Sequence, residues 1–438
     1  MLDIITQVRQ VFEESEGQVI KIIEEKLNNI ENSQAEDIST LTAPLELELN
    51  KLGRKLVKEV LELKDSEIKN SDERLLEGWK VERKNDKKSL ITVFGETEYS
   101  RTYYRRENEV GDYEYTYLVN DLFGIGNHQR LEPLVEAKLI DTASDTSYRK
   151  SGKRTVNDVT ISDSTVMNKV HKLEGLDEEL EDKEEDNKRE VEVLYIEADE
   201  DHVALQSGRN AIAKLVYVHE GYQEEYDKES SRSRLKNVKY IAGEYKESEE
   251  IWLEVVDYLY ETYDMDRVKK IFIGGDGDPW IKEGLNWLPE AKFILDRYHL
   301  NDYVITATVH SKKHRNMLWG ALNTANRDKV SILFSDLIGR TEDDRRKERI
   351  REARHYIYNQ WEGIKNAAED KDAINPSAEG HVSHILASRL SSRPMGWSKI
   401  GMDRMSKLRA FKFNGGTEKD IFALIRKRDR DREKQDFL

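Results

Sequence analysis

Two apolar runs of strand length end abruptly in carboxylates, and these runs constrain the fold more than any other feature of the chain. They are VEVLYIEADEDHVALQ at 191–206 and VKKIFIGGDGDPWI at 268–281. Acidic residues at a strand tip reach out of a parallel sheet into an open crevice, which is where α/β sheets bind ligands and metals. The two runs therefore predict an α/β domain with a divalent-metal site.

Three acids are the candidates for that site. Asp199 and Asp276 lie at the two strand tips, and the segment SAEGHVSHILASRL supplies Glu379. If this segment is a helix, Glu379 shares a face with Val382 and Leu386, so its carboxylate is expected to point toward the core. A carboxylate on an apolar face is costly unless it is paired or binds a metal. We therefore predict that Glu379 is a metal ligand.

The first acid has an alternative, because EADEDHV places Asp199, Glu200 and Asp201 side by side. Alternation along a strand does not separate Asp199 from Asp201, since both point to the same face. Asp199 is favoured here, and Asp201 stays the alternative. Three glycines flank the second acid, at positions 274, 275 and 277. They either leave room for a phosphate to approach or only form turns.

Length and composition exclude several classes of protein. The 438 residues suffice for two or three domains with sizeable cores, and the absence of cysteine excludes disulfides, thiolate zinc sites and a cysteine nucleophile. No apolar stretch approaches the roughly 18 residues needed to span a bilayer. The N-terminal residues lack the basic and apolar regions of a signal peptide. A cytoplasmic protein is expected.

The net charge of −16 has the wrong sign for a general nucleic-acid binder, but the charge is segregated. Residues 174–192 are mostly acidic, whereas residues 386–438 carry fourteen Lys or Arg against seven Asp or Glu. This basic stretch is a candidate for contacts with a DNA backbone, with a solvated basic face as the alternative. The candidate residues are Arg389, Arg393, Lys399, Arg404, Lys407 and Arg409.

The N-terminal part of the chain is predicted to be mostly helical with a small β-hairpin. Residues 88–105 alternate with a period of two around a glycine, which is typical of a hairpin. There Arg101, Arg105 and Arg106 interleave with tyrosines, as in a phosphate-tracking surface, although a plain exposed strand explains them equally well. The helical segments between 131 and 173 are compatible with a DNA-binding helix-turn-helix or with a packed helical pair.

The order of the later elements is that of a ribonuclease-H-like core, in which three successive strands are followed by a helix and two further strands. The first strand is expected at the centre of a mixed sheet, with the fourth strand beside it. The predicted domains are a helical region (1–86), a hairpin and helix-turn-helix-like DNA-binding region (87–174), an acidic linker (175–190), a catalytic domain (191–300 and 376–412), a helical insertion (301–375) and a basic tail (413–438).

The motifs EADEDHV, GGDGDPWI, LDRYHL and AEGHVSHILASRLSSRPMGW, in this order, resemble those of DDE transposases of bacterial insertion sequences. The likeness is greatest to the IS-Lre family, which is also catalogued as an uncharacterised protein family, and looser to Mutator-type transposases. It covers nearly the whole chain. The resemblance implies that Asp199, Asp276 and Glu379 are the catalytic acids. It also implies that Asp296 and His299, at the end of the fifth strand, support the active site.

Such a triad would serve phosphodiester hydrolysis and strand transfer. Both reactions pass through an in-line transition state with extra negative charge, which two divalent ions stabilise. Hard oxygen ligands suit Mg²⁺ or Mn²⁺. The resemblance implies double-stranded DNA as partner, both terminal repeats and target, with at least a dimer acting on nucleoid DNA. The alternatives are a structure-selective nuclease of the same fold and a catalytically silent DNA-binding or regulatory relative.

Overall fold

The computed structural model describes residues 2–31, 37–108, 110–176, 188–223, 234–393 and 395–436. The chain divides into two units. The N-terminal unit comprises Met1–Lys169 and Glu418–Leu438, and the core unit comprises Val170–Thr417. Among the helices of these described residues, none is long and apolar enough to cross a membrane.

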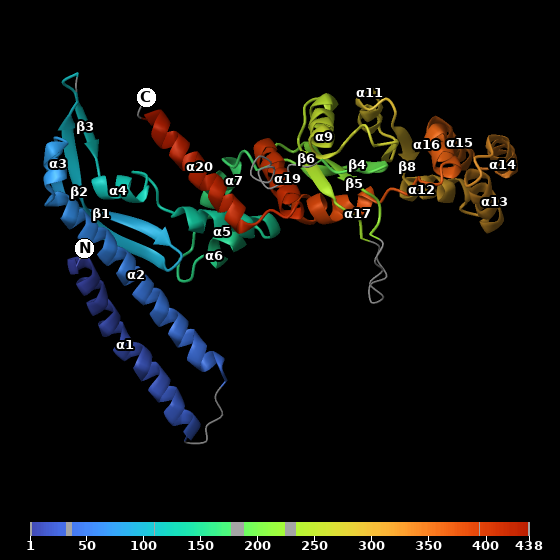
Figure 1. Cartoon of the computed structure of the whole chain (residues 1–438). Coiled ribbons are helices and arrows are strands. Elements are labelled where there is room, and N and C mark those ends of the chain that lie inside the picture. The colour runs from blue at the N-terminus through green and yellow to red at the C-terminus, as the bar shows by residue number, and fades with distance from the viewer. Residues whose placement is uncertain are drawn as a thin grey trace. The chain divides into compact units, whose positions relative to one another are not determined.

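The N-terminal unit begins with two long helices, α1 (Leu2–Glu31) and α2 (Ser39–Lys69), which pack side by side (Figure 1). Their apolar residues recur at three- and four-residue spacings, as the sequence predicts for amphipathic helices. The short helix α3 (Asp72–Leu76) follows, and the Ser71 hydroxyl caps it by accepting a hydrogen bond from the Arg74 N–H. The helical prediction for this region is confirmed as far as residue 76.

The predicted hairpin is longer than expected and gains a third strand. Strand β1 (Lys80–Thr92) pairs antiparallel with β2 (Gly95–Glu107), which in turn pairs with β3 (Tyr113–Thr116). Gly95 begins β2 with a φ of 116°, which favours glycine because it has no Cβ. Strand β1 begins at Lys80, inside the region 1–86 that was expected to be helical.

The segment expected as a basic tail is an ordered helix in its described part. This helix, α20, packs against α5, and Arg428 donates a hydrogen bond to the buried carboxylate of Glu136 (3.0 Å). The Ser162 hydroxyl caps α7 (Asp163–His171) by accepting a hydrogen bond from the Thr165 N–H (3.2 Å). The helices of this part are α4 (Leu118–Phe123), α5 (Pro133–Asp145), α6 (Tyr148–Arg154), α7 (Asp163–His171) and α20 (Glu418–Asp436).

The core unit is built on a mixed five-stranded sheet of order β6-β5-β4-β7-β8. Strand β5 runs antiparallel to β4 and β6, whereas β4, β7 and β8 are parallel. As predicted, the first strand is central and the fourth lies beside it. Residues 177–187 of the expected acidic linker lie outside the described residues. The strands are β4 (Val193–Ala204), β5 (Asn210–His219), β6 (Lys239–Gly243), β7 (Lys270–Gly275) and β8 (Lys292–Leu295).

Strand β4 has one apolar and one polar face, because successive side chains point to opposite sides of a sheet. Ile196 and Ala198 belong to the main hydrophobic core, together with Trp252 and Val255 of α9 (Ser248–Thr262). The opposite face carries acids, and it packs against a later helical segment that includes α17 (Ala378–Val382). Figure 1 shows α9 and α17 on opposite sides of the sheet.

The expected insertion is helical and extends the same core. Its side chains Val304, Leu333 and Ile357 belong to the hydrophobic cluster that covers the sheet. The fifth strand is shorter than predicted, because it ends at Leu295 and Asp296 caps the next helix. The helices are α10 (Pro279–Lys282), α11 (Gly284–Trp287), α12 (Arg297–Thr308), α13 (Lys312–Leu322), α14 (Arg327–Arg340), α15 (Asp344–Asn359) and α16 (Trp361–Glu369).

The helix predicted to carry the third acid is interrupted by a π turn. Arg409 donates to the carbonyls of Ile385 (2.8 Å) and His384 (2.6 Å), within this turn. Single π turns inside helices occur frequently at functional sites. The four pieces are α17 (Ala378–Val382), the π turn η1 (Ser383–Ala387), α18 (Ser388–Leu390) and, after a connection, α19 (Lys399–Phe413).

Candidate active site

The polar face of β4 lies along the chain segment that carries the third acid. Near one end of the strand, the Tyr195 hydroxyl donates to the Asp372 carbonyl (2.7 Å). Near the other end, the Ser391 hydroxyl donates to the Asp201 carboxylate (2.8 Å). The segment therefore follows the strand over this distance, and Glu379 lies between the two contacts in sequence.

Asp199 is the most perturbed acid on this face. It is only 7% exposed, its Oδ1 accepts from the Glu200 N–H (2.8 Å), and its Oδ2 has no hydrogen-bond partner among the described residues. Burial, together with the negative charges of Asp276 and Glu379, raises the pKa of Asp199 to about 7, although the Glu200 N–H and His299 act in the opposite direction. The three predicted acids thus share one electrostatic environment.

Asp276 lies in the loop after β7, and the helical insertion holds that loop in place. Its Oδ1 accepts from the Asp278 N–H (2.9 Å), which shapes the turn. The Tyr356 hydroxyl donates to the Asp276 carbonyl (2.7 Å), and the Gln360 side chain donates to the Gly277 carbonyl (3.2 Å). The insertion therefore positions the second acid.

The three glycines beside this acid serve close packing. A Cβ on Gly274 would lie 2.5 Å from the Pro376 ring, and one on Gly277 would lie 2.3 Å from Gln360. A Cβ on Gly275 would meet the Ala198 carbonyl at 2.8 Å. The suggestion that these glycines leave room for a phosphate is wrong, because protein atoms already fill that space.

Glu379 is exposed, so the expectation that it faces the core is wrong. Ala378 and Val382 bury their side chains instead, and Leu386 follows beyond the start of the π turn. The prediction assumed a continuous helix with 3.6 residues per turn, whereas α17 has five residues and then widens. Glu379 nevertheless acts electrostatically on Asp199, so its carboxylate lies on the solvent side of the site.

Asp296 and His299 form a hydrogen-bonded pair at the start of α12 rather than at the end of a strand. Asp296 is buried, accepts from the Tyr298 N–H (2.9 Å) and lies 3.0 Å from His299 Nδ1. The hydrogen bond with Asp296, together with the charges of Asp296, Asp199 and Asp276, raises the pKa of His299 to about 9, although burial acts in the opposite direction. A protonated imidazole near neutral pH therefore faces the cluster of acids.

A buried carboxylate two residues before Asp199 was missed by the sequence analysis. Glu197 is 3% exposed and accepts hydrogen bonds from the Tyr217 hydroxyl and the Ser377 N–H, and its Oε1 lies 3.1 Å from His219 Nε2. The signal was present in the sequence, because the first, third and fifth letters of EADED are acids on one strand face.

Three of the nine predicted DNA-binding residues are buried, which contradicts their expected exposure. Arg101 is 7% exposed and lies over the Tyr117 ring (3.5 Å), and Arg389 is 4% exposed and lies over Trp397 (4.8 Å). Arg409 is also 7% exposed and is bonded to the π turn. These arginines stack and bond inside the protein, because a planar guanidinium matches rings and carbonyls.

The other six cations remain at least partly exposed, and five of them form ion pairs with carboxylates. Arg393 is exposed. The paired residues are Arg105 with Glu82 (3.2 Å), Arg106 with Glu114 (2.7 Å), Lys399 with Glu244 (2.7 Å), Arg404 with Glu174 (2.7 Å) and Lys407 with Asp403 (3.4 Å). A phosphate would have to compete with these carboxylates.

A basic helix in the insertion was also missed. Helix α15 carries six Lys or Arg against three Asp or Glu, and Arg345, Arg349 and Arg351 are exposed. The charge run DDRRKERIREAR could have indicated this surface from the sequence. The same helix ends near Tyr356, which holds the loop of the second acid.

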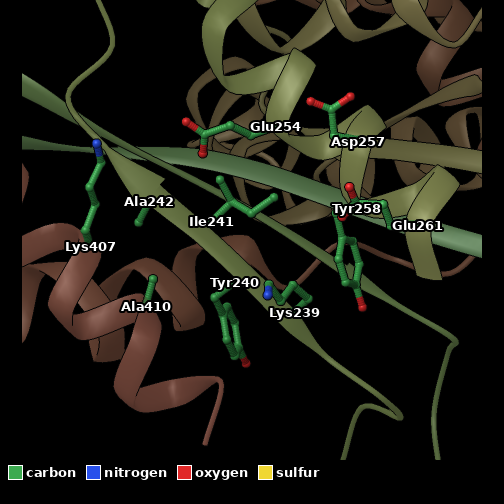
Figure 2. A pocket seen from close by; sticks show the side chains of 10 residues that line it. All are labelled: Lys239, Tyr240, Ile241, Ala242, Glu254, Asp257, Tyr258, Glu261, Lys407 and Ala410. Carbon is green, nitrogen blue, oxygen red and sulfur yellow. The ribbon is translucent and has the colours of Figure 1, made fainter. Parts of the chain in front are cut away.

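A cavity of about 230 Å³ lies away from these acids, at the edge strand β6. Figure 2 shows Glu254 and Asp257 on α9 and Lys239 on β6, with Lys407 on α19. None of the three predicted acids lines it. Lys407 therefore lies beside acidic side chains, which disfavours a role in binding phosphate.

The donor atoms of the acidic cluster suit a divalent metal, although the cluster is not a closed cage. Asp199 has a buried oxygen without a partner, and carboxylate oxygens are the ligands that Mg²⁺ and Mn²⁺ prefer. Over the described ranges, no group of three or more His, Cys, Asp or Glu is arranged to hold an ion. Mg²⁺ is often bound by one or two carboxylates with waters and substrate phosphates. The residues fit a site of that open kind.

Comparison with known proteins places the chain in a family. The model of an uncharacterised protein family, UPF0236, matches residues 33–426. The chain belongs to this family. A relative in Caldanaerobacter subterraneus subsp. tengcongensis, UPF0236 protein TTE0610/TTE0881/TTE1053/TTE2432, is 44% identical over 96% of this chain and 85% of its own. The UPF0236 protein in vanSb 3'region of Streptococcus gallolyticus is 25% identical over 78% of this chain and 76% of its own.

Among solved structures, the chain is similar to one from the Drosophila P element transposase strand transfer complex. The match covers 68% of this chain and 82% of the other, at 11% sequence identity and a TM-score of 0.23. A likeness of this size supports no conclusion about function, so the residues of the site carry the functional argument.

Proposed function

We propose that this UPF0236 protein is a DNA transposase of the DDE type, with Asp199, Asp276 and Glu379 as its catalytic acids. One observation carries the proposal. Asp199 is a buried carboxylate with an oxygen that has no partner, at the centre of a mixed sheet, and the charges of Asp276 and Glu379 raise its pKa. Buried charges normally find partners, so this arrangement favours a ligand that is charged and positive.

The fold we propose for the core unit is ribonuclease-H-like. The support is the strand order β6-β5-β4-β7-β8 with β5 antiparallel, because it puts the first strand next to the fourth. Asp199 lies within the first of these strands, and Asp276 directly follows the fourth. The helical segment with the third acid then packs on the same face.

In this mechanism the three acids would hold Mg²⁺ or Mn²⁺, which supplies charge stabilisation for an in-line attack on a phosphodiester. The protein's own groups provide the geometry. Asp199 is fixed by its strand, the loop of Asp276 is fixed by Tyr356, and Glu379 lies at the exposed side where DNA would enter. His299, held by Asp296, adds a positive charge beside the acids.

The partner we propose is double-stranded DNA, both the element's ends and the target, bound by at least a dimer. The overall negative charge requires that the DNA contacts be local. Helix α15 offers exposed arginines and is connected through Tyr356 to the Asp276 loop, so a basic surface leads toward the site. The partly exposed hairpin cations Arg105 and Arg106, which pair with Glu82 and Glu114, are a second candidate surface.

The name of the Caldanaerobacter relative adds support of a different kind. It joins four designations in one organism. Such a name suits a sequence present in several copies in a genome, which is what transposition produces. A silent relative or a nuclease receives no specific support from any observation on this chain.

The proposal is tested with the genomic DNA that flanks the gene on both sides, as a labelled substrate in Mg²⁺ or Mn²⁺. Cleavage at the ends and joining to a plasmid are measured for the native chain and for Asp276→Asn and Glu379→Gln. Binding of the same DNA and the thermal midpoint are measured in parallel. Arg267→Gln, which breaks a surface ion pair with Asp264 outside the site, is the control.

We expect cleavage and joining by the native chain and the control, and rates of both that are lower by about a thousandfold or more in the two acid variants, with binding retained. Cleavage without joining would replace the transposase by a nuclease. Binding without cleavage by the native chain would favour the silent relative. Full activity of either acid variant would overturn the triad.

A further inference from the structure

The buried acid Glu197 lies on the same face of β4 as Asp199, two residues earlier, yet it is fully occupied. The Tyr217 hydroxyl and the Ser377 N–H donate to Oε2, and His219 Nε2 lies 3.1 Å from Oε1. We call these four residues the Glu197 network. Burying a carboxylate costs several kcal/mol unless hydrogen-bond donors compensate for the lost water. All three partners are therefore needed to stabilise the buried Glu197 carboxylate.

His219 is a donor in this network. The Gly221 N–H donates to His219 Nδ1 (3.1 Å), so in the neutral ring the hydrogen is on Nε2 and points to Glu197. Glu197 therefore accepts from three donors that come from two places, β5 and the start of α17. It joins the strand that holds the first acid to the helix that holds the third.

The network continues to the other end of α17. The His381 ring stacks on Tyr217 with centroids 4.4 Å apart, and His381 Nδ1 lies 2.9 Å from the Tyr240 hydroxyl. Glu379 lies between Ser377 and His381 in sequence. The short helix is thus attached to the sheet on both sides of the third acid.

We propose that Glu197 is a positioning residue that fixes Glu379 beside Asp199, an inference that rests on the proposed function. Helix α17 is the first, five-residue part of a helical stretch that continues through the π turn to Leu390, and helices this short take most of their stability from tertiary contacts. Glu379 is exposed, and its side chain makes no hydrogen bond or ion pair with the described residues of the sheet, whereas its neighbours Ser377 and His381 bond to Glu197 and Tyr240. The position of the third acid therefore depends on contacts made by its neighbours.

Glu197 is not itself a metal ligand in this proposal. Its two oxygens already accept from the network, whereas Asp199 retains an oxygen without a partner. The negative charges of Asp276 and Glu379 contribute to the raised pKa of Asp199. The two acids therefore have separate tasks, one to hold the helix and one to bind the ion.

The test uses Glu197→Gln in the full chain. Glutamine keeps the volume but puts an NH₂ group where a carboxylate oxygen accepted, so one donor of the network faces another donor. The matched control is Glu220→Gln, the same change at a mostly buried acid of the core unit that pairs with Lys236 (3.1 Å). Hydrogen exchange of the amides in 377–387 is the first readout, because it requires no activity.

We expect these amides to exchange about tenfold faster or more in Glu197→Gln than in the native chain, and at the native rate in Glu220→Gln. The second readout is the rate of DNA-end cleavage in a double-mutant cycle with Glu379→Gln. Glu197→Gln should slow cleavage about a hundredfold alone and cause no further loss when Glu379 is already changed.

Two results would overturn the inference: unchanged exchange across 377–387, or losses that add fully in the double variant. Both glutamine variants could lower the thermal midpoint equally. If only Glu197→Gln then accelerates exchange in 377–387, the effect on the helix is local and is not a consequence of general destabilisation. Absence of cleavage by the native chain would refute the proposed function, while the exchange result would still decide whether Glu197 holds the helix.

Discussion

Glu197 and Asp199 are carboxylates on one face of one strand, two residues apart, and their surroundings are opposite. Both are less than a tenth exposed. Every oxygen of Glu197 has a donor, from Tyr217, His219 or Ser377, whereas one oxygen of Asp199 has none. The comparison teaches that burial alone does not mark a functional acid. An acid that is buried, incompletely bonded and also coupled to other acids does.

The same difference separates stability from activity. A satisfied buried carboxylate holds its neighbours together, and removing it leaves several donors without an acceptor. An unsatisfied one raises the free energy of the folded chain until a cation or a proton compensates it. Burial and the nearby acids raise the pKa of Asp199 to about 7, which expresses this cost.

The largest effect is expected from Asp199→Asn on cleavage. If this acid binds the catalytic ion, the amide should lower the single-turnover rate of DNA-end cleavage by about a thousandfold or more, since metal stabilisation of the transition state is worth several kcal/mol. Binding of the same DNA should change little, because the phosphate contacts are elsewhere. A rate within tenfold of the native one would assign the first acid elsewhere.

The second effect is on stability and concerns the other acid. Glu197→Ala should lower the free energy of unfolding by about 4 kcal/mol, because Tyr217, His219 and the Ser377 N–H all lose a buried acceptor. Chemical denaturation without metal measures it. Asp199→Ala, on the same strand face, is the control and should cost far less. Equal losses for both would erase the contrast between the two acids.

The third prediction is the pH dependence of stability in metal-free buffer. The folded pKa of Asp199 lies above its unfolded value of 3.8, so the folded chain binds more protons between about pH 4 and 7. Stability from this group is therefore lost as pH rises through that window and is constant above it. Asp199→Asn should lack this loss, so its stability relative to the native chain should rise by about 3 kcal/mol between pH 4 and 8.

Thermal midpoints across this range, in the presence of a chelator, check the sign. If the difference in thermal midpoint between Asp199→Asn and the native chain stays constant with pH, the ionised form of Asp199 does not destabilise the folded chain. Added Mg²⁺ should raise the midpoint of the native chain at pH 8 and leave the variant unchanged, because a bound cation replaces the missing partner.

The sequence predicts the central sheet and the two strand acids well, for a physical reason. Apolar runs that alternate or end in carboxylates report the sheet directly, since strand periodicity and burial are local properties. Asp276 directly follows the parallel strand β7, as its run predicts, whereas Asp199 lies inside β4, which continues to Ala204, and not at a strand tip. The first strand pairs with the fourth, as the chain order indicated.

What the sequence did not predict depends on contacts between distant segments. The π turn is not encoded by spacing, so the prediction that Glu379 faces the core failed. Arg389 and Arg409 count as surface charge in any composition, yet Trp397 and the carbonyls of the π turn bury them. The role of Glu197 requires His219 and Ser377, which meet it only in the fold.

The smallest effect is expected from Asp201→Asn, the third acid on this strand face and the alternative first acid. Asp201 resembles Asp199 in burial and in having one oxygen without a partner in the described part of the chain. It differs in its surroundings, because the Ser391 hydroxyl donates a hydrogen bond to its other oxygen. Burial raises the pKa of Asp201, and neither Asp276 nor Glu379 contributes to this shift. An amide keeps an acceptor for that hydroxyl.

Cleavage by Asp201→Asn should therefore stay within about tenfold of the native rate, and the free energy of unfolding within about 1 kcal/mol. The comparison with Asp199→Asn under identical conditions is the measurement, because the two changes are chemically the same and two residues apart. A thousandfold loss for Asp201→Asn with an active Asp199→Asn would exchange their roles. Electrostatic coupling to Asp276 and Glu379 distinguishes Asp199 from Asp201 in this proposal. That result would show that such coupling does not identify the catalytic carboxylate.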